Sequence, residues 1–396
     1  MALALSGLAL LAGCRGAPEP EPLPEPPTAE QIRADLVGVR FAFMEDASGP
    51  REWVVEPGEV RGLDIVDQIV DEGGEIARSR VGLVLGAPER VIRGEMVVRH
   101  RREGAAWAFE HAERAGPDWT AGDAEATLYS VAAVADSAGS RRLLRLQPLA
   151  RYARGLYTDP LAPFAAEARA LFDSSFAADS ARAAAERALA RRASGALGAA
   201  GRRVYLLGRA RAPEPARTDS ARAELFGCPS AAVYVTAPEA AGWATLATTS
   251  GVMGRPQTPG GVLGRDLARA LDRAARERFA ASGVSTDRLR QQAALTADLD
   301  GDGRDEALGV FSVDADGAAL ALAVRATATG HEVLYERRPD RAAGFTRLRL
   351  LGALDVDADG AAESLFEERG ERRRRTLVVT HLADRFTDAF RGAEGC

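Results

Sequence analysis

The feature that most constrains the fold is a nine-residue acidic pattern that occurs twice near the C-terminus. Residues 298–306 and 355–363 both follow DxDxDGxxE, and the second copy starts 57 residues after the first. Repetition at such an interval predicts two copies of one supersecondary unit. Short apolar runs follow each copy, which predicts strands at 308–313, 320–324 and 331–335 and again at 365–366, 377–379 and 386–390.

The spacing of the acids predicts a metal site. Carboxylates at positions one, three and five of a tight loop converge on one side, the glycine at position six takes the turn, and the carbonyl at seven and the acid at nine complete a set of oxygen donors. Such hard donors suit Ca²⁺ and, without His or Cys, suit Zn²⁺ poorly. An EF-hand has its glutamate at position twelve, between helices. The alternative is two solvated acidic turns that hold no ion.

The loops resemble the calcium loops of FG-GAP and VCBS-type repeats, which occur in integrin-like propeller blades with the same spacing in a β-hairpin. The resemblance covers about residues 290–396, and the family more often has Asp where this chain has Glu at position nine. It implies propeller-blade-like repeats and calcium ligands at Asp298, Asp300, Asp302, the Arg304 carbonyl and Glu306, and at Asp355, Asp357, Asp359, the Ala361 carbonyl and Glu363.

The N-terminus predicts export and a lipid anchor. Residues 3–12 are apolar but too few to span a bilayer, and they end in Leu11-Ala12-Gly13-Cys14, which resembles a bacterial lipobox. We therefore expect residues 1–14 to be a lipoprotein signal peptide with its lipobox, with acyl chains on Cys14. Residues 15–27 alternate Pro and Glu and predict an extended linker. The alternative is an apolar leader in which Cys14 is incidental.

Three cysteines are an odd number for an exported chain. Lipidation of Cys14 leaves Cys228 and Cys396, and an oxidising compartment favours a disulfide between them. The alternative is two separate thiols.

The remaining pattern predicts an α+β chain in three parts. Residues 28–116 predict a small NTF2-like or cystatin-like α+β domain, with Thr28 capping a helix that stops near Gly38. Residues 117–200 predict a helical connector, and residues 201–396 a β-rich domain with the two calcium-loop repeats. Strands between 201 and 260 either supply further blades or leave the repeats as an open structure. The basic run at 372–375 predicts a solvated, charge-balanced hairpin.

Composition limits the function. A net charge of −6 gives no basis for nucleic-acid binding, and all basic residues except His are Arg, which excludes lysine-based catalysis. Motifs such as GxSxG and HExxH are missing. We expect no enzyme but a binding or scaffolding protein of the bacterial cell envelope, at the outer membrane's periplasmic face or the cell surface, with a protein or glycan partner. The alternatives are a glycan-hydrolase-like enzyme with a site between domains, using acids such as Asp64, Asp67 or Glu110, and a pure spacer.

Overall fold

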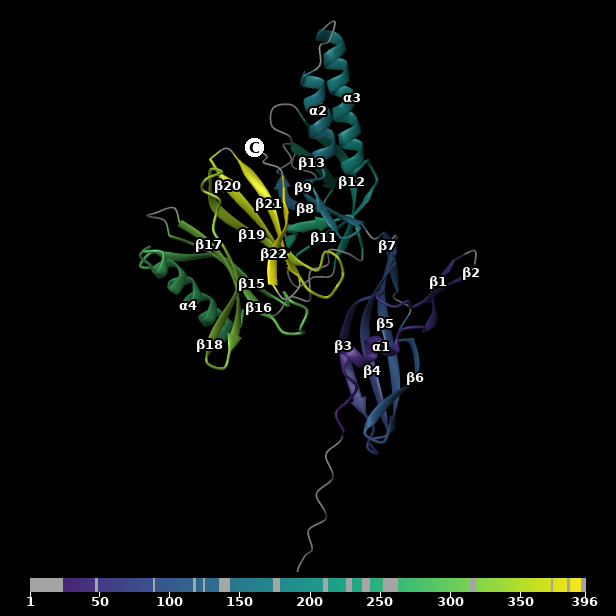
Figure 1. Ribbon diagram of the computed structural model, residues 1–396. Coiled ribbons are helices and arrows are strands. Elements are labelled where there is room, and N and C mark those ends of the chain that lie inside the picture. The colour runs from purple at the N-terminus through teal and green to yellow at the C-terminus, as the bar shows by residue number, and fades with distance from the viewer. Residues whose placement is uncertain are drawn as a thin grey trace, which may run out of the picture.

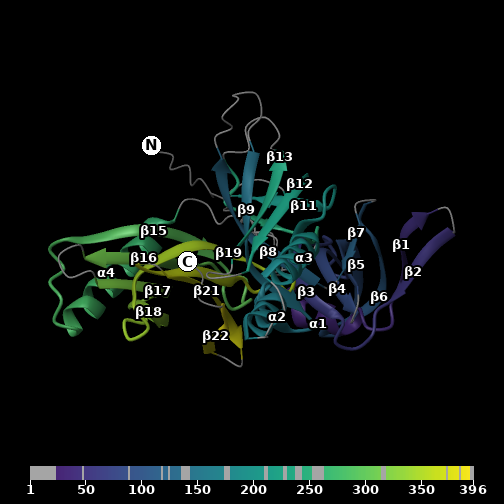
Figure 2. The same cartoon turned by 90° about the horizontal axis from the view of Figure 1, so that it is seen from above.

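The chain folds into three units that pack against one another, as two views at right angles show (Figure 1, Figure 2). An N-terminal sheet lies at one end, a β-barrel with two helices in the middle, and a pair of sheets with one helix at the other end. In this computed structural model no helix among the described residues is long and apolar enough to cross a membrane. The described residues are 24–46, 49–87, 90–116, 119–123, 125–134, 143–173, 179–208, 213–225, 230–236, 243–251, 263–313, 318–371, 373–382 and 385–392.

The N-terminal unit is an antiparallel sheet with one short helix. Its strand order is β3-β4-β5-β6, and β7 pairs with the first part of β5. A separate β1–β2 hairpin extends from this sheet (Figure 1). The elements are α1 (Ala29–Asp35), β1 (Arg40–Asp46), β2 (Gly49–Val54), β3 (Val60–Val70), β4 (Ile76–Ala87), β5 (Arg90–Glu103), β6 (Ala106–Arg114) and β7 (Thr120–Asp123).

The predicted helix start is confirmed. The Thr28 hydroxyl oxygen accepts a hydrogen bond from the Gln31 amide at 3.2 Å, and Gly38 has a φ of +84° just past the helix. Ile32 and Leu36 are fully buried in one core with apolar side chains of β3, β4 and β5. A helix of only seven residues would be barely stable in isolation, and the burial of Ile32 and Leu36 stabilises it.

A closed six-stranded barrel forms the middle unit. Its order is β9-β13-β12-β11-β14-β8, and β8 pairs with β9 to close the ring, so the barrel has no free edge. The strands are β8 (Glu125–Val134), β9 (Leu143–Ala153), β11 (Arg203–Leu207), β12 (Glu214–Glu224), β13 (Ser230–Thr236) and β14 (Leu246–Thr248), and β10 (Leu156–Thr158) extends the sheet from the end of β9.

Two helices pack on the barrel, α2 (Ala162–Asp173) and α3 (Asp179–Gly198). Leu189, Ala193 and Leu197 of α3 share a core with barrel side chains, and the Tyr129 hydroxyl donates to the Leu197 carbonyl at 2.8 Å. Alanine side chains bury little apolar area, so the Ala-rich helix α3 depends on packing against the barrel for its stability. The segment predicted as a helical connector thus contains strands β7 to β10 before its two helices.

The C-terminal unit contains two four-stranded antiparallel sheets of the same design. The orders are β15-β16-β17-β18 and β19-β20-β21-β22. The strands are β15 (Leu289–Ala297), β16 (Glu306–Val313), β17 (Ala318–Thr327), β18 (Gly330–Arg337), β19 (Phe345–Leu354), β20 (Glu363–Gly370), β21 (Arg374–Leu382) and β22 (Arg385–Arg391). Each acidic loop joins the first two strands of its sheet, as the repeat predicted.

The sheets stack because their strands alternate apolar side chains. In β17, Leu320, Leu322 and Val324 pack against α4 (Arg265–Ala281), whereas the alanines between them pack against the second sheet. The small alanines let the two sheets approach closely. The unit is therefore layered as helix, sheet and sheet, and the second sheet also contacts the barrel through Val378 and Phe390.

The predicted α+β class is confirmed in part, since the described residues form a β-rich chain with few helices. The strands between 201 and 260 pair with β8 and β9 in the barrel, so they supply no blades to the C-terminal repeats. Of the two arrangements left open by the sequence, the described residues show open paired sheets.

Buried ion pairs also join the two C-terminal sheets. Arg337 of β18 contacts Glu368 of β20 at 3.0 Å and Asp388 of β22 at 2.8 Å. Arg375 of β21 pairs with the other oxygen of Glu368, whose side chain is fully buried, and with Asp340. The prediction that the basic run is solvated is wrong for Arg375, whose side chain is only 10% exposed.

Candidate metal site

The two acidic loops occupy equivalent places in their sheets. The first loop joins β15 to β16, where Ala297 pairs with Glu306, and the second joins β19 to β20, where Leu354 pairs with Glu363. In both, the acid at position nine is therefore the first residue of the second strand. It lies directly across from the residue that precedes the first aspartate.

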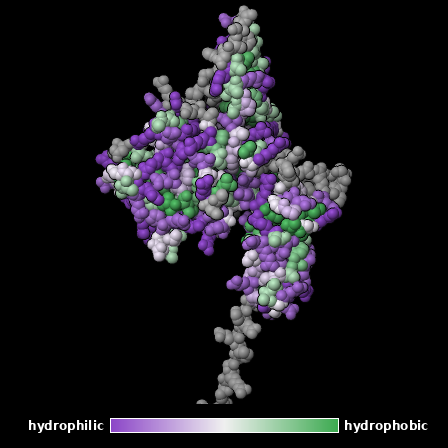
Figure 3. Space-filling model, viewed as in Figure 1, coloured by the Kyte–Doolittle hydropathy of each residue, from purple (hydrophilic) through white to green (hydrophobic). Residues whose placement is uncertain are grey.

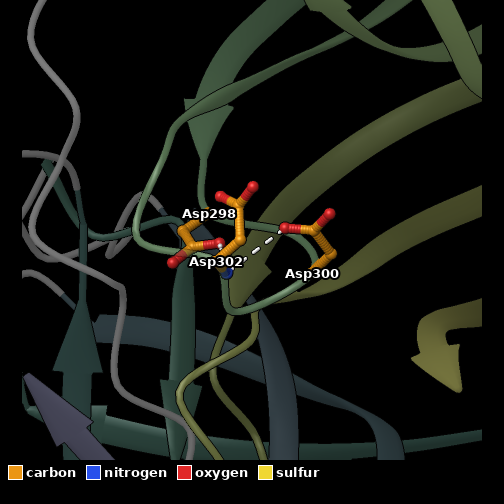
Figure 4. Close-up of side chains that lie close together, drawn as sticks. All are labelled: Asp298, Asp300 and Asp302. Atoms are coloured by element: carbon orange, nitrogen blue, oxygen red, sulfur yellow. Dashed lines mark hydrogen bonds between the residues drawn. The ribbon is translucent and has the colours of Figure 1, made fainter. Parts of the chain in front are cut away.

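The aspartates at positions one, three and five converge in each loop. One carboxylate oxygen from each of Asp298, Asp300 and Asp302 lies within 4.8 Å of the others, and the second loop has the same arrangement. Figure 4 shows the first loop, with its three side chains gathered around one turn. Oxygens that share a Ca²⁺ at about 2.4 Å lie no more than about 5 Å apart, so both triplets have suitable spacing.

The glycine at position six makes the predicted turn. Gly303 has a φ of +81° and Gly360 a φ of +96°, which side chains other than glycine rarely adopt. Position four is left-handed as well, with Gly301 at +75° and Ala358 at +63°. The alanine holds this conformation at a steric cost, which is a feature of functional loops.

The first loop is fully paired. Asp298 accepts from the amides of Gly301, Asp302 and Gly303, and the buried Glu306 accepts from the Leu299 amide at 2.9 Å. Arg325 of β17 donates to Glu306 at 3.1 Å, contacts Asp300 and lies 3.5 Å from Asp302. A guanidinium thus compensates the negative charge of this loop.

The second loop has a different charge balance. Asp355 is 6% exposed, and its Oδ1 atom is buried without a hydrogen-bond partner. Glu363 accepts from the Val356 amide at 2.6 Å and from the Thr380 hydroxyl at 3.2 Å. Among the described residues no cationic side chain forms an ion pair with the acids of this loop.

The pKa values follow from this burial. Burial and the charges of Asp359 and Asp357 raise the pKa of Asp355 to about 8, and burial with the Asp359 charge raises that of Asp357 to about 7. Burial also raises the pKa of Glu363 well above its usual range. Protons and a divalent cation would therefore compete for these carboxylates.

The two loops lie side by side. The Ala362 amide donates to the Asp298 carbonyl at 2.8 Å, and Ala361 packs beside Gly301. At position seven, the amides of Arg304 and Ala361 each donate to the aspartate two residues earlier, which holds position five in place.

The second loop also sits where all three units meet. Val356 and Ala358 share a core with Val84 and Val91 of the N-terminal sheet and with barrel side chains such as Leu128. A Cβ atom added at Gly62 of β3 would lie only 3.3 Å from the Ala358 carbonyl oxygen. The loop's geometry is thus coupled to the packing of the N-terminal sheet.

Three further residues at the loops were not identified from sequence. Arg325 of β17 and Thr380 of β21 come from the third strand of each sheet, and the Tyr157 hydroxyl of β10 is buried without a hydrogen-bond partner among the described residues. Tyr157 packs against the core that contains Val356 and Ala358 of the second loop, and burial, followed by the charges of Glu363 and Asp357, raises its pKa. Strand register would have identified the first two, since each lies opposite position nine.

Other predicted site residues lie elsewhere. Cys14, Cys228 and Cys396 lie outside the described residues, so the lipid anchor and the disulfide stay predictions. Asp64 and Asp67 are exposed on β3, whereas Glu110 is on β6 at the opposite edge of the sheet and pairs with Arg99 and Arg101. The structure does not bring these three acids together.

A cavity of about 670 Å³ lies at one end of the barrel. It is lined by the starts of β8 and β11, the end of β9 and parts of α2 and α3, and includes Arg151, Arg202 and Tyr205. Arg151 is paired with Glu125 at its rim. The cavity contains none of the acids of either loop.

No protein-family model, curated protein or solved structure matches the chain.

Proposed function

We propose that this chain is a lipid-anchored protein of the bacterial cell envelope whose C-terminal unit binds Ca²⁺ through its acidic loops and serves as a binding or scaffolding module. The observation that carries the proposal is the buried Oδ1 atom of Asp355, which lies beside other carboxylates and has no hydrogen-bond partner among the described residues. An unpaired buried carboxylate oxygen is costly, and a bound cation removes that cost.

The donor set supports calcium in particular. The second loop offers Asp355, Asp357, Asp359 and Glu363, which are all oxygen donors, and the Ala361 carbonyl occupies position seven. Ca²⁺ accepts six to eight oxygens in flexible geometry, whereas Mg²⁺ demands a near-ideal octahedron and retains water. When bound, the ion would supply two positive charges to a loop that lacks a cationic partner.

The repeat architecture supports the finer fold proposal. We take β15–β18 and β19–β22 as two FG-GAP or VCBS-like repeats, because each places its DxDxDGxxE loop between its first two antiparallel strands. We take the N-terminal unit as NTF2-like or cystatin-like, because one helix packs on a curved antiparallel sheet. Both assignments are proposals from topology.

A scaffolding role fits the place of the second loop. Its apolar residues lie in the core that the three units share, so an ion there would stabilise the arrangement of the units as well as one hairpin. Hydrophilic residues cover most of the visible C-terminal unit in the space-filling view (Figure 3), as expected for a surface exposed to water. The partner is a protein or a glycan.

Direct calcium binding tests the proposal. We expect isothermal titration of the chelator-treated full chain with CaCl₂ to show saturable binding in excess Mg²⁺, and Asp355→Asn to weaken it roughly tenfold or more, since ligand charge sets calcium affinity. Asn keeps the shape of the side chain and cannot carry the negative charge that a calcium ligand provides, so the variant should fold and bind calcium more weakly. Asp67→Asn, an exposed acid on β3, is the matched control. A wild-type protein without calcium-dependent heat would contradict the proposal.

The lipid anchor needs a separate test. We expect cells fed a labelled fatty acid to incorporate the label into this protein and to retain it in the membrane fraction, because two or three acyl chains give stable anchoring. Cys14→Ser should abolish labelling, whereas Cys228→Ser should not. Label that persists in Cys14→Ser would show that acylation, if any, occurs elsewhere.

A further inference from the structure

The two loops differ at one structurally equivalent position. In the first sheet, Ala307 pairs with Val324, so the next register position places Glu306 opposite Arg325. In the second sheet, Ser364 pairs with Val379, which places Glu363 opposite Thr380. The position that faces the ninth acid is therefore a cation in one repeat and a neutral hydroxyl in the other.

Arg325 provides partners for carboxylate oxygens of the first loop. Its guanidinium donates to Glu306 Oε1 and contacts the Oδ2 atoms of Asp300 and Asp302. Backbone amides satisfy the other oxygen of each of these acids and both oxygens of Asp298. Every carboxylate oxygen of the four acids thus has a partner.

In the part of the chain that the structure describes, no cationic side chain plays this part in the second loop. Thr380 donates one hydrogen bond to Glu363, and Arg61 and Arg93 influence the pKa values of the loop only through longer-range electrostatics. Asp355 Oδ1 has no hydrogen-bond partner among the described residues, and one carboxylate oxygen from each of Asp355, Asp357 and Asp359 lies within 4.8 Å of the others. Ionised carboxylates this close repel one another, and a bound cation would relieve that repulsion.

We infer that the chain holds one calcium ion, in the second loop, and that the Arg325 guanidinium takes the place of an ion in the first. The inference rests on the proposed function and adds the stoichiometry and the residue that sets it. A calcium ion entering the first loop would have to displace Arg325 from three acids at once, including Glu306, whose side chain is fully buried. An ion entering the second loop would meet the neutral Thr380 hydroxyl at the position that Arg325 occupies in the first.

The stoichiometry of bound calcium tests this inference. We expect equilibrium dialysis of the full chain followed by atomic emission to give one Ca²⁺ per wild-type chain and two per Arg325→Thr chain, because threonine reproduces the second loop. Arg276→Thr removes an exposed arginine from α4 and should leave one ion. Two ions on the wild type, or one on folded Arg325→Thr, would overturn the inference while leaving calcium binding intact. No ion on the wild type would overturn the proposed function.

A second variant tests the inference if Arg325→Thr does not fold. Asp300→Asn neutralises an acid of the first loop and should leave one ion bound at unchanged affinity, because the inference gives that loop no ion. Asp357→Asn, at the equivalent position of the second loop, should lose the ion. Loss of calcium in Asp300→Asn would place an ion in the first loop and overturn the inference.

Discussion

Calcium is expected to raise the melting temperature of the full chain by about 5–10 °C at pH 8 and by much less at pH 5. A ligand at 100 times its dissociation constant stabilises the folded state by about 2.7 kcal/mol, and a unit of 150–250 residues gains about 2–4 °C per kcal/mol. Differential scanning calorimetry in chelator and in calcium, at both pH values, gives the measurement.

The pH dependence follows from the two raised carboxyl pKa values in the second loop. In the ion-free folded state, Asp355 titrates at about 8 and Asp357 at about 7, whereas both titrate near 3.8 when unfolded. The folded state therefore binds more protons between pH 4 and 8, and these groups reduce stability as the pH rises through that window. Calcium competes with the same protons, so its stabilising effect grows with pH.

A variant separates this effect from general ionic stabilisation. Asp357→Asn should remove the calcium-dependent shift at pH 8, and Asp64→Asn, which changes an exposed acid on β3, should retain it. Equal melting temperatures in chelator and calcium at pH 8 for the wild type would contradict the calcium proposal.

Glu368→Ala is expected to destabilise the C-terminal unit by about 3–5 kcal/mol, because it leaves two buried arginines without their shared partner. Glu368 joins Arg337 of one sheet to Arg375 of the other, and these arginine side chains are 14% and 10% exposed. Arg375 also stacks over the Phe345 ring, with 4.5 Å between guanidinium and ring centroid. Urea unfolding followed by circular dichroism measures the loss.

The matched control is an exposed ion pair. Arg276→Ala removes a pair with Asp272 in which both side chains are 50% exposed, and we expect a change below about 1 kcal/mol. A loss for Glu368→Ala no larger than that of the control would show that the network between the sheets contributes little to stability.

The acidic loops were predictable because they are local. Nine residues define each loop, and the glycine at position six is required by a backbone angle within the loop itself. Helix α4 was predictable for the same reason, since its buried face, with Leu271 and Phe279, repeats at helical spacing.

Contacts set by strand register were not predictable. Arg325 lies 19 residues beyond Glu306, and its role depends on how β17 aligns with β16. Arg375 belongs to the basic run that predicts a solvated hairpin, yet strand β21 places its side chain between the two sheets. Neither fact is encoded in local spacing.

The barrel was missed because its closure is non-local. Strand β8 pairs with β14, so Leu128 lies opposite Thr248, more than a hundred residues away. The sequence between them includes two alanine-rich helices, which led the whole segment to be predicted as a helical connector. Burial on both sides of β8 overrides local propensity there.

The open edge of β3 has a consequence for self-association. Ile65, Val66 and Ile69 are 38%, 54% and 61% exposed on this strand, and an apolar edge of this length is a template for strand addition between molecules. Asp64 and Asp67 stand beside these apolar side chains and would place negative charges at the junction with a second copy, and the ladder between β3 and β4 is irregular between Ile65 and Asp67. Like-charge repulsion and a local bulge thus oppose the addition of a second molecule to this edge. The barrel needs no such features, because its strands close into a ring and leave no unpaired edge.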